Sequence, residues 1–224
     1  MRIEPFGVEL WMNEFENDCE LNLAETCVDS LTVQELLDLT GTSPTDLVDG
    51  LAPLRLSYGA IEGTTRLRAA IAALYQATDP EQILVTHGAI GANHLVHHTL
   101  VEPDDRVISV VPNYQQHYSI PESIGAEVVR LPLLPEDGYQ IDLDQMLDQL
   151  AGLATPGTKL IALSNPNNPT GALLGPDQLA RLAEIATGCG AYILCDEVYR
   201  GLEREDPGST PSIADLYELS LIHI

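Results

Sequence analysis

Two apolar runs, each followed closely by a polar motif, constrain the fold of this chain most strongly. Residues 159–164 (KLIALS) precede the motif 168–171 (NPTG), and residues 191–195 (AYILC) precede the motif 196–199 (DEVY). Short apolar runs bounded by turn residues are typical of buried strands. Open α/β sheets bind ligands outside the carboxyl ends of their strands. The sequence therefore predicts that Asn168, Asp196 and Tyr199 reach one crevice at a sheet edge.

The middle of the chain alternates between strand and helix patterns. Strands alternating with helices of ten or more residues imply crossover connections, and therefore an α/β fold with a mostly parallel sheet. Pro121 is expected to break or kink its helix, since proline has no N–H to donate. The expected strands are 83–86, 106–111, 127–131, 159–164 and 191–195, and the expected helices are 64–76, 88–100, 114–124, 142–150 and 176–187.

Residues 1–50 have a different pattern and are predicted to form a separate N-terminal arm. Residues 8–16 suit a short amphipathic helix, and Pro44 begins another turn of helix. Thr32 and Glu35 have the spacing of a capping box, which predicts a helix from there through Leu39.

Composition excludes several classes of partner. The formal charge is −24, from 34 acidic and 10 basic residues. Nucleic acid and anionic membranes repel such a surface, so neither is an expected partner. The four cysteines form no CxxC pair, no signal peptide opens the chain, and no apolar run is long enough to span a bilayer. We therefore expect a soluble, cytoplasmic protein with reduced thiols.

The two strand-end motifs resemble those of the class I/II aminotransferases, the pyridoxal-phosphate-dependent enzymes of fold type I. The stretch 164–171 (SNPNNPTG) carries the resemblance most specifically, and the similarity runs from Tyr58 to Tyr199, more loosely from residue 1. It implies a three-layer sandwich that forms the large domain. It also implies pyridoxal 5'-phosphate as the cofactor, and transfer of an amino group between an amino acid and a keto acid.

The resemblance gives four residues contacts with the cofactor ring. It implies that Asp196 pairs with the pyridine nitrogen, which keeps the ring an electron sink. Asn168 and Tyr199 would donate hydrogen bonds to the phenolate oxygen, and Tyr114 would stack on the ring. Taken alone, Asp196 suits a carboxylate capping the next turn, Asn168 suits a turn residue, and Tyr114 suits ordinary packing.

The phosphate has its own predicted contacts. Gly88, Ala89 and Ile90 follow a predicted strand and open a helix, where free amides and the helix dipole favour an anion. A plain strand-to-helix turn is the alternative for the same residues. The resemblance also implies that Tyr58 reaches the phosphate of the partner subunit, and so that the full-length protein is a homodimer.

The chain contains no residue suited to the central step of this chemistry. Pyridoxal phosphate is held by a lysine, and the one lysine here is Lys159, at the start of a predicted strand. Relatives place theirs on a later strand. We therefore predict an N-terminal fragment that lacks the Schiff-base lysine and is inactive by itself. No catalytic residue is predicted within it. Its incomplete large domain would span 51–218. Residues 219–224 (LSLIHI) resemble a translated sequencing adaptor, with a genuine strand as the alternative.

Other readings of the same residues remain open. Residues 86–93 and 114–116 are closer to the branch that contains capreomycidine synthase, which suggests cyclisation or β-elimination of an amino acid instead of amino transfer. A non-catalytic chain that binds a phosphate ligand is a further alternative. His94, His97 and His98 share one face of a predicted helix, but they lack a partner ligand at metal-binding spacing, so no metal site is predicted.

Overall fold

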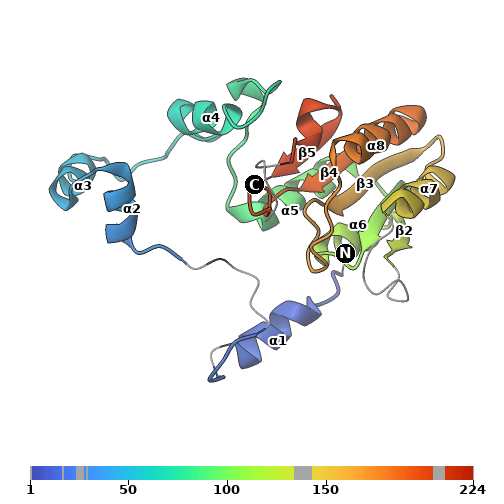
Figure 1. The fold of residues 1–224 in the computed structure, drawn as a ribbon, viewed down its shortest axis with the longest axis horizontal. Helices are drawn as coiled ribbons and strands as arrows, with labels where there is room; N and C mark the ends of the chain where they lie inside the picture. The colour runs from blue at the N-terminus through green and yellow to red at the C-terminus, as the bar shows by residue number, and fades with distance from the viewer. Residues whose placement is uncertain are drawn as a thin grey trace. The chain divides into compact units, whose positions relative to one another are not determined.

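The computed structural model of the chain describes residues 2–16, 18–23, 28, 30–133, 143–203 and 210–223. The chain divides into two compact units. The smaller consists of Pro5–Ile61, and the larger consists of Met1–Glu4 together with Glu62–Ile224. Figure 1 shows the helices and strands of both. The expected domain boundary near residue 50 and the expected origin of residues 219–224 stay predictions.

The described residues of the smaller unit contain three short helices. They are α1 (Gly7–Phe15), α2 (Val33–Thr40) and α3 (Pro44–Leu51). The backbone N–H of Glu35 donates to Thr32 Oγ1 at 3.2 Å, and the N–H of Thr32 donates to Glu35 Oε2 at 2.7 Å. These reciprocal bonds confirm the predicted capping box and satisfy two backbone donors at the start of α2.

The larger unit is built on a five-stranded parallel sheet. Its strands have the order β2-β1-β3-β4-β5, and every neighbouring pair is parallel. This arrangement confirms the α/β fold with a mostly parallel sheet that the alternating pattern predicted. The strands are β1 (Arg106–Val111), β2 (Glu127–Pro132), β3 (Thr158–Ser164), β4 (Tyr192–Asp196) and β5 (Ser220–His223).

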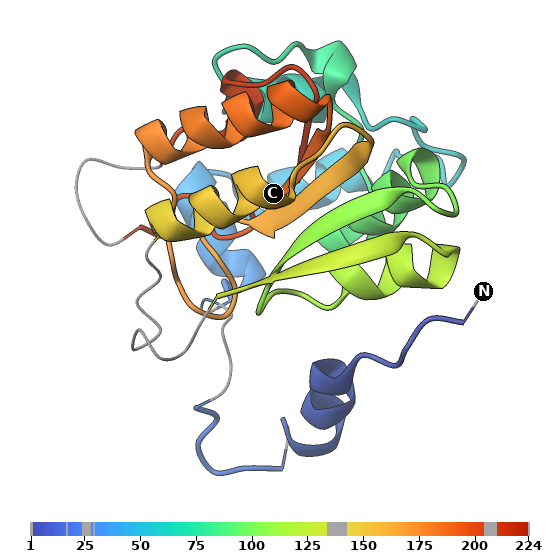
Figure 2. The same ribbon diagram turned by 90° about the vertical axis from the view of Figure 1, so that its right-hand side faces the viewer.

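Helices cover both faces of this sheet. In Figure 2, α7 (Leu143–Leu153) and α8 (Pro176–Cys189) lie side by side on one face, and α5 (Gly88–Leu100) and α6 (Gln116–Ile124) lie on the other. The result is a three-layer sandwich. Outside these layers, α4 (Thr65–Ala72) precedes the sheet. The described connections include the 3-10 turns η1 (Pro80–Gln82) and η3 (Ile213–Asp215).

The alternation of side chains along the strands explains why helices cover both faces of the sheet. Ile108, Ile161 and Ile193 belong to one buried cluster, whereas the residue just before or after each in the strand belongs to the other. Successive side chains of a strand point to opposite faces. Because both faces are apolar, the strands read as continuous hydrophobic runs, as expected for a parallel sheet between two helical layers.

Two local expectations were wrong. Residues 83–86 form no strand in the described part of the chain; instead the Val85 N–H donates to the Glu62 carbonyl at 3.0 Å. The helix expected over 64–76 ends at Ala72. The Asp215 carboxylate accepts hydrogen bonds from the backbone N–H groups of residues 76 and 77, just beyond this helix. The first of these bonds joins residues that are 139 positions apart in the chain. Pro121 lies inside the single helix α6, so it does not break the helix, and the kink expected as the alternative stays a prediction.

Candidate functional site

Three of the predicted polar segments meet at the carboxyl edge of the sheet. Ser164 and Asp196, the last residues of β3 and β4, are register partners. The Asn165 N–H donates to the Asp196 carbonyl at 2.8 Å, and Ser164 Oγ donates to Asn113 Oδ1 at 2.6 Å. The segments that follow β1, β3 and β4 are therefore held next to one another, as expected from the position of ligand sites in such sheets.

Asp196 presents a partly covered carboxylate at this edge. Its side chain is 13% exposed, and its Oδ1 accepts a hydrogen bond from the Val198 N–H at 3.1 Å. The second oxygen, Oδ2, lies 3.9 Å from Nε2 of His117, a fully buried side chain of α6. A carboxylate so placed can stabilise a cationic group that enters the edge of the sheet.

Sequence reasoning missed His117. The available signal was its position three residues after Tyr114, at the second residue of the helix that follows β1. Of the histidines near residue 94, His94 and His98 are exposed, and their ring centroids lie 4.2 Å apart. No group of three or more histidine, cysteine or acidic residues suited to a metal ion occurs among the described residues.

His97 is the buried member of that helical group. Its ring centroid lies 6.4 Å from that of His117. Burial, together with smaller contributions from the neighbouring His98 and His94, lowers the pKa of His97 to about 4. The His97 imidazole is therefore neutral at pH 7.

The buried His97 predicts an acid-dependent loss of stability. Its folded-state pKa of about 4 is below the ordinary 6.5, so its contribution is present above pH 6.5 and is lost as the pH falls toward 4. The expected loss is about 3 kcal/mol of unfolding free energy. Urea unfolding at pH 7, 5.5 and 4 should show a shallower decline for His97→Gln than for the unmodified protein. Parallel declines would contradict this assignment.

The loop after β3 divides its asparagines between two roles. Asn165 Oδ1 accepts from the Leu174 N–H at 2.8 Å, and Asn167 Nδ2 donates to Thr170 Oγ1 at 2.8 Å. Both side chains are buried, at 3% and 7% exposure, whereas Asn168 is half-buried. The first two asparagines thus hold the loop, and Asn168 is the one that the fold leaves more open to a ligand.

The predicted phosphate loop begins α5. Gly88 has φ +69, a left-handed conformation that favours glycine, and its carbonyl accepts from Thr86 Oγ1 at 3.1 Å. The Ile90 carbonyl accepts from Gln116 Nε2 at 3.2 Å, and Gln116 Oε1 accepts from Asn93 Nδ2 at 3.3 Å. This amide pair joins the start of α5 to α6, which begins two residues after Tyr114.

The three predicted tyrosines and Lys159 lie in different parts of the chain. Tyr114 and Tyr199 are half-buried in the larger unit, just beyond β1 and β4. Tyr58 is fully exposed in the smaller unit, so its contact with a partner subunit stays a prediction. Lys159 is the second residue of β3, five positions from Ser164. At about 3.3 Å per residue it lies roughly 16 Å from the carboxyl edge, which is too far to act there.

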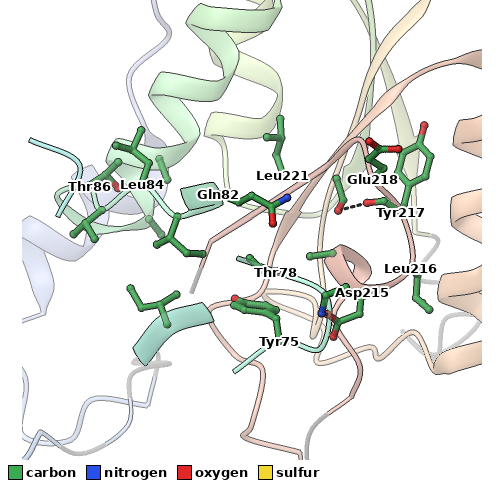
Figure 3. Close-up of a pocket in the computed structure, with 18 of the residues that line it drawn as sticks. Tyr75, Thr78, Gln82, Leu84, Thr86, Asp215, Leu216, Tyr217, Glu218 and Leu221 are labelled. Carbon is green, nitrogen blue, oxygen red and sulfur yellow. Dashed lines mark hydrogen bonds between the residues drawn. The ribbon is translucent and has the colours of Figure 1, made fainter. Parts of the chain in front are cut away.

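A cavity of about 730 Å³ opens beside the start of α5. Figure 3 shows Leu84 and Thr86 on one side of it and Tyr217 and Glu218 on another. Its lining includes Gly88 and Ala89 of the predicted phosphate loop, but Asp196 is not among the lining residues. The cavity therefore adjoins only the phosphate-loop part of the predicted site.

Comparison with known proteins places the chain in a family. Residues 31–222 match the model for the aminotransferase class I and II family. A PLP-dependent aminotransferase from Streptococcus suis has a crystal structure similar over 99% of this chain and 57% of its own, with a TM-score of 0.91 and 44% identity. This chain therefore belongs to the aminotransferase class I and II family.

Two curated relatives show how far the similarity extends. The arginine–pyruvate transaminase AruH of Pseudomonas aeruginosa is 33% identical over 177 residues, which are 75% of this chain and 44% of the relative. Capreomycidine synthase of Streptomyces vinaceus is 29% identical over 213 residues, which are 93% of this chain and 52% of the relative. The chain thus spans about half the length of the curated relatives it matches.

No helix in the described residues is both long and apolar enough to cross a membrane.

Proposed function

We propose that this chain is the N-terminal part of a pyridoxal-phosphate-dependent aminotransferase, which moves an amino group between an amino acid and a keto acid. The observation that carries the proposal is the meeting of Asp196 with the segments after β1 and β3 at one sheet edge. Family membership and the half-length match to aminotransferases support it.

The residues at this edge suit the cofactor by their chemistry. A partly covered carboxylate, Asp196, suits a protonated pyridine nitrogen. The start of α5, with its left-handed Gly88 and free first-turn amides, suits a phosphate group. When bound, pyridoxal phosphate supplies an electron sink for negative charge that develops at the α-carbon of an amino acid.

Each residue of the site has a defined task in this proposal. Asp196 would hold a proton on the pyridine nitrogen by electrostatic attraction, and Asn168 and Tyr199 would donate hydrogen bonds to the phenolate oxygen. Tyr114 would cover the ring and exclude water from it. The backbone N–H groups of the 88–90 segment orient the phosphate.

Two further assignments belong to the longer protein. We expect it to be a homodimer in which Tyr58 contacts the phosphate bound to the partner subunit, and to act in the cytoplasm on small amino and keto acids. The 224-residue chain is expected to be inactive alone, because Lys159 is far from the carboxyl edge.

A cofactor-binding experiment tests these assignments. Pyridoxal 5'-phosphate should bind the 224-residue chain reversibly, as measured by equilibrium dialysis and by a change in its absorption. Borohydride treatment followed by peptide mass mapping should leave no cofactor on Lys159, whereas the longer parent protein should retain one on another lysine. Cofactor fixed on Lys159, or the absence of any binding, would contradict the proposal.

A second reaction deserves testing because of one relative. Capreomycidine synthase matches 93% of this chain, a larger share than AruH matches. The same fold supports several reactions of amino acids. The longer parent protein should be incubated with pyruvate and a panel of amino acids. Alanine formed from pyruvate indicates amino transfer, while a cyclised or ammonia-releasing product formed without a keto acid indicates the alternative.

A further inference from the structure

The turn that follows Asp196 carries a second residue of the proposed site, Tyr199. Its backbone bonds are local: the Arg200 N–H donates to the Glu197 carbonyl at 2.9 Å, and the Leu202 N–H donates to the Tyr199 carbonyl at 3.1 Å. Local bonds shape a turn but do not set its orientation relative to the sheet. Long-range side-chain contacts therefore have to do so.

Glu197 makes the first of these contacts. The residue is 2% exposed, and its Oε1 accepts hydrogen bonds from Ser212 Oγ at 2.9 Å and from the Ile213 N–H at 3.1 Å. Ser212 and Ile213 are both fully buried, and Ile213 belongs to the larger apolar cluster. The carboxylate thus ties the turn to the core of the unit through η3.

Arg200 makes the second contact, three residues later. Its Nε donates to the Thr210 carbonyl at 2.9 Å, and its Nη2 donates to the Leu74 carbonyl at 3.2 Å, across 126 positions. The guanidinium carbon lies 5.2 Å from the centre of the Tyr75 ring, a cation–π contact. Nε also lies 3.9 Å from Glu197 Oε2, so the two anchors are electrostatically linked.

A buried carboxylate is a poor choice for stability alone. Burial raises the pKa of Glu197, which means that the folded state disfavours its charge. Its stabilising contribution is therefore present below pH 4.5 and is lost as the pH rises through the raised folded-state value. Oε2 has no hydrogen-bond partner among the described residues. An apolar side chain would fill such a position at a lower cost, so a role in orientation accounts better for the carboxylate.

We propose that Glu197 and Arg200 are positioning residues, which hold the turn so that Asp196 and Tyr199 address the same bound cofactor. Neither residue needs to touch the cofactor. Glu197 follows Asp196 directly, and Arg200 follows Tyr199 directly, so each anchor fixes the backbone next to one functional side chain. This inference rests on the proposed function, because that function gives Asp196 and Tyr199 a common ligand.

Paired substitutions of Glu197 test the proposal. Glu197→Gln keeps an oxygen that accepts from Ser212 and Ile213, whereas Glu197→Leu removes it. Amide hydrogen exchange over residues 198–202 should be at least about tenfold faster in the leucine variant, with a similar loss of affinity for pyridoxal 5'-phosphate. The glutamine variant should stay within about threefold of the unmodified chain in both measurements. Glu184→Leu, at an exposed carboxylate of α8, is the control and should change neither.

Two outcomes would overturn the inference. One is unchanged exchange over 198–202 in the leucine variant, and the other is an equal loss in the leucine and glutamine variants. If Glu197→Leu unfolds, exchange in β1 and β3 will rise as well, and Arg200→Lys then decides: it should raise exchange over 198–202 alone. If the unmodified chain binds no pyridoxal phosphate, the proposed function fails, while the exchange data still decide whether the anchors hold the turn.

Discussion

Replacing Asp196 with asparagine should weaken the affinity of the chain for pyridoxal 5'-phosphate by about 10²–10³-fold. Removing one partner of a buried charge pair costs about 3–5 kcal/mol, since the remaining charge is left uncompensated. Each factor of ten in affinity corresponds to about 1.4 kcal/mol. Asparagine has nearly the same shape as aspartate, so steric effects are small. Equilibrium dialysis of the unmodified and variant chains measures the change.

The control for this prediction is Asp177→Asn, at an exposed carboxylate near the start of α8. It alters the net charge by the same amount and should leave the affinity unchanged. An equal loss in both variants would show that overall charge, rather than the position of Asp196, governs binding. Unchanged affinity in Asp196→Asn would remove Asp196 from the site.

The second large effect concerns the centre of the sheet. Replacing Ile161 with alanine should lower the unfolding free energy of the larger unit by about 2–5 kcal/mol, through lost transfer energy and the cavity left behind. Ile161 is fully buried on β3, between β1 and β4, and belongs to the larger apolar cluster. Urea unfolding, followed by circular dichroism, measures the change in midpoint.

Two companion variants make this measurement specific. Ile161→Val removes one methylene and should cost about 0.5–1.5 kcal/mol. Leu39→Ala changes a side chain of α2 that is 73% exposed, in the other unit, and should have little effect on this transition. A loss in Ile161→Ala no greater than in the valine variant would contradict the buried position of Ile161.

Local sequence was sufficient wherever an element carries its own start signal or its own apolar run. The limits of α5 and β1 match the predicted ranges, and the Thr32 capping box opens α2 as expected. These features depend on neighbours within about four residues, so the sequence contains all the information that they need.

The absence of a strand at the described residues 83–86 shows what local sequence does not contain. That segment has the composition of a strand, yet a strand needs a pairing partner, and its described hydrogen bond goes to the Glu62 carbonyl instead. Residues 219–224 show the converse, since four of them form β5 beside β4. Pairing is a long-range event, and only the tertiary structure decides it.

The candidate site divides in the same way. The polar motifs and the strand ends that carry them follow from local sequence, because side-chain chemistry and apolar runs are local properties. Only the tertiary structure brought His117 to Asp196, and Ser212 and Ile213 to Glu197. Those contacts join residues far apart in the chain, and their existence depends on how helices and connections pack against the sheet, which local patterns do not specify.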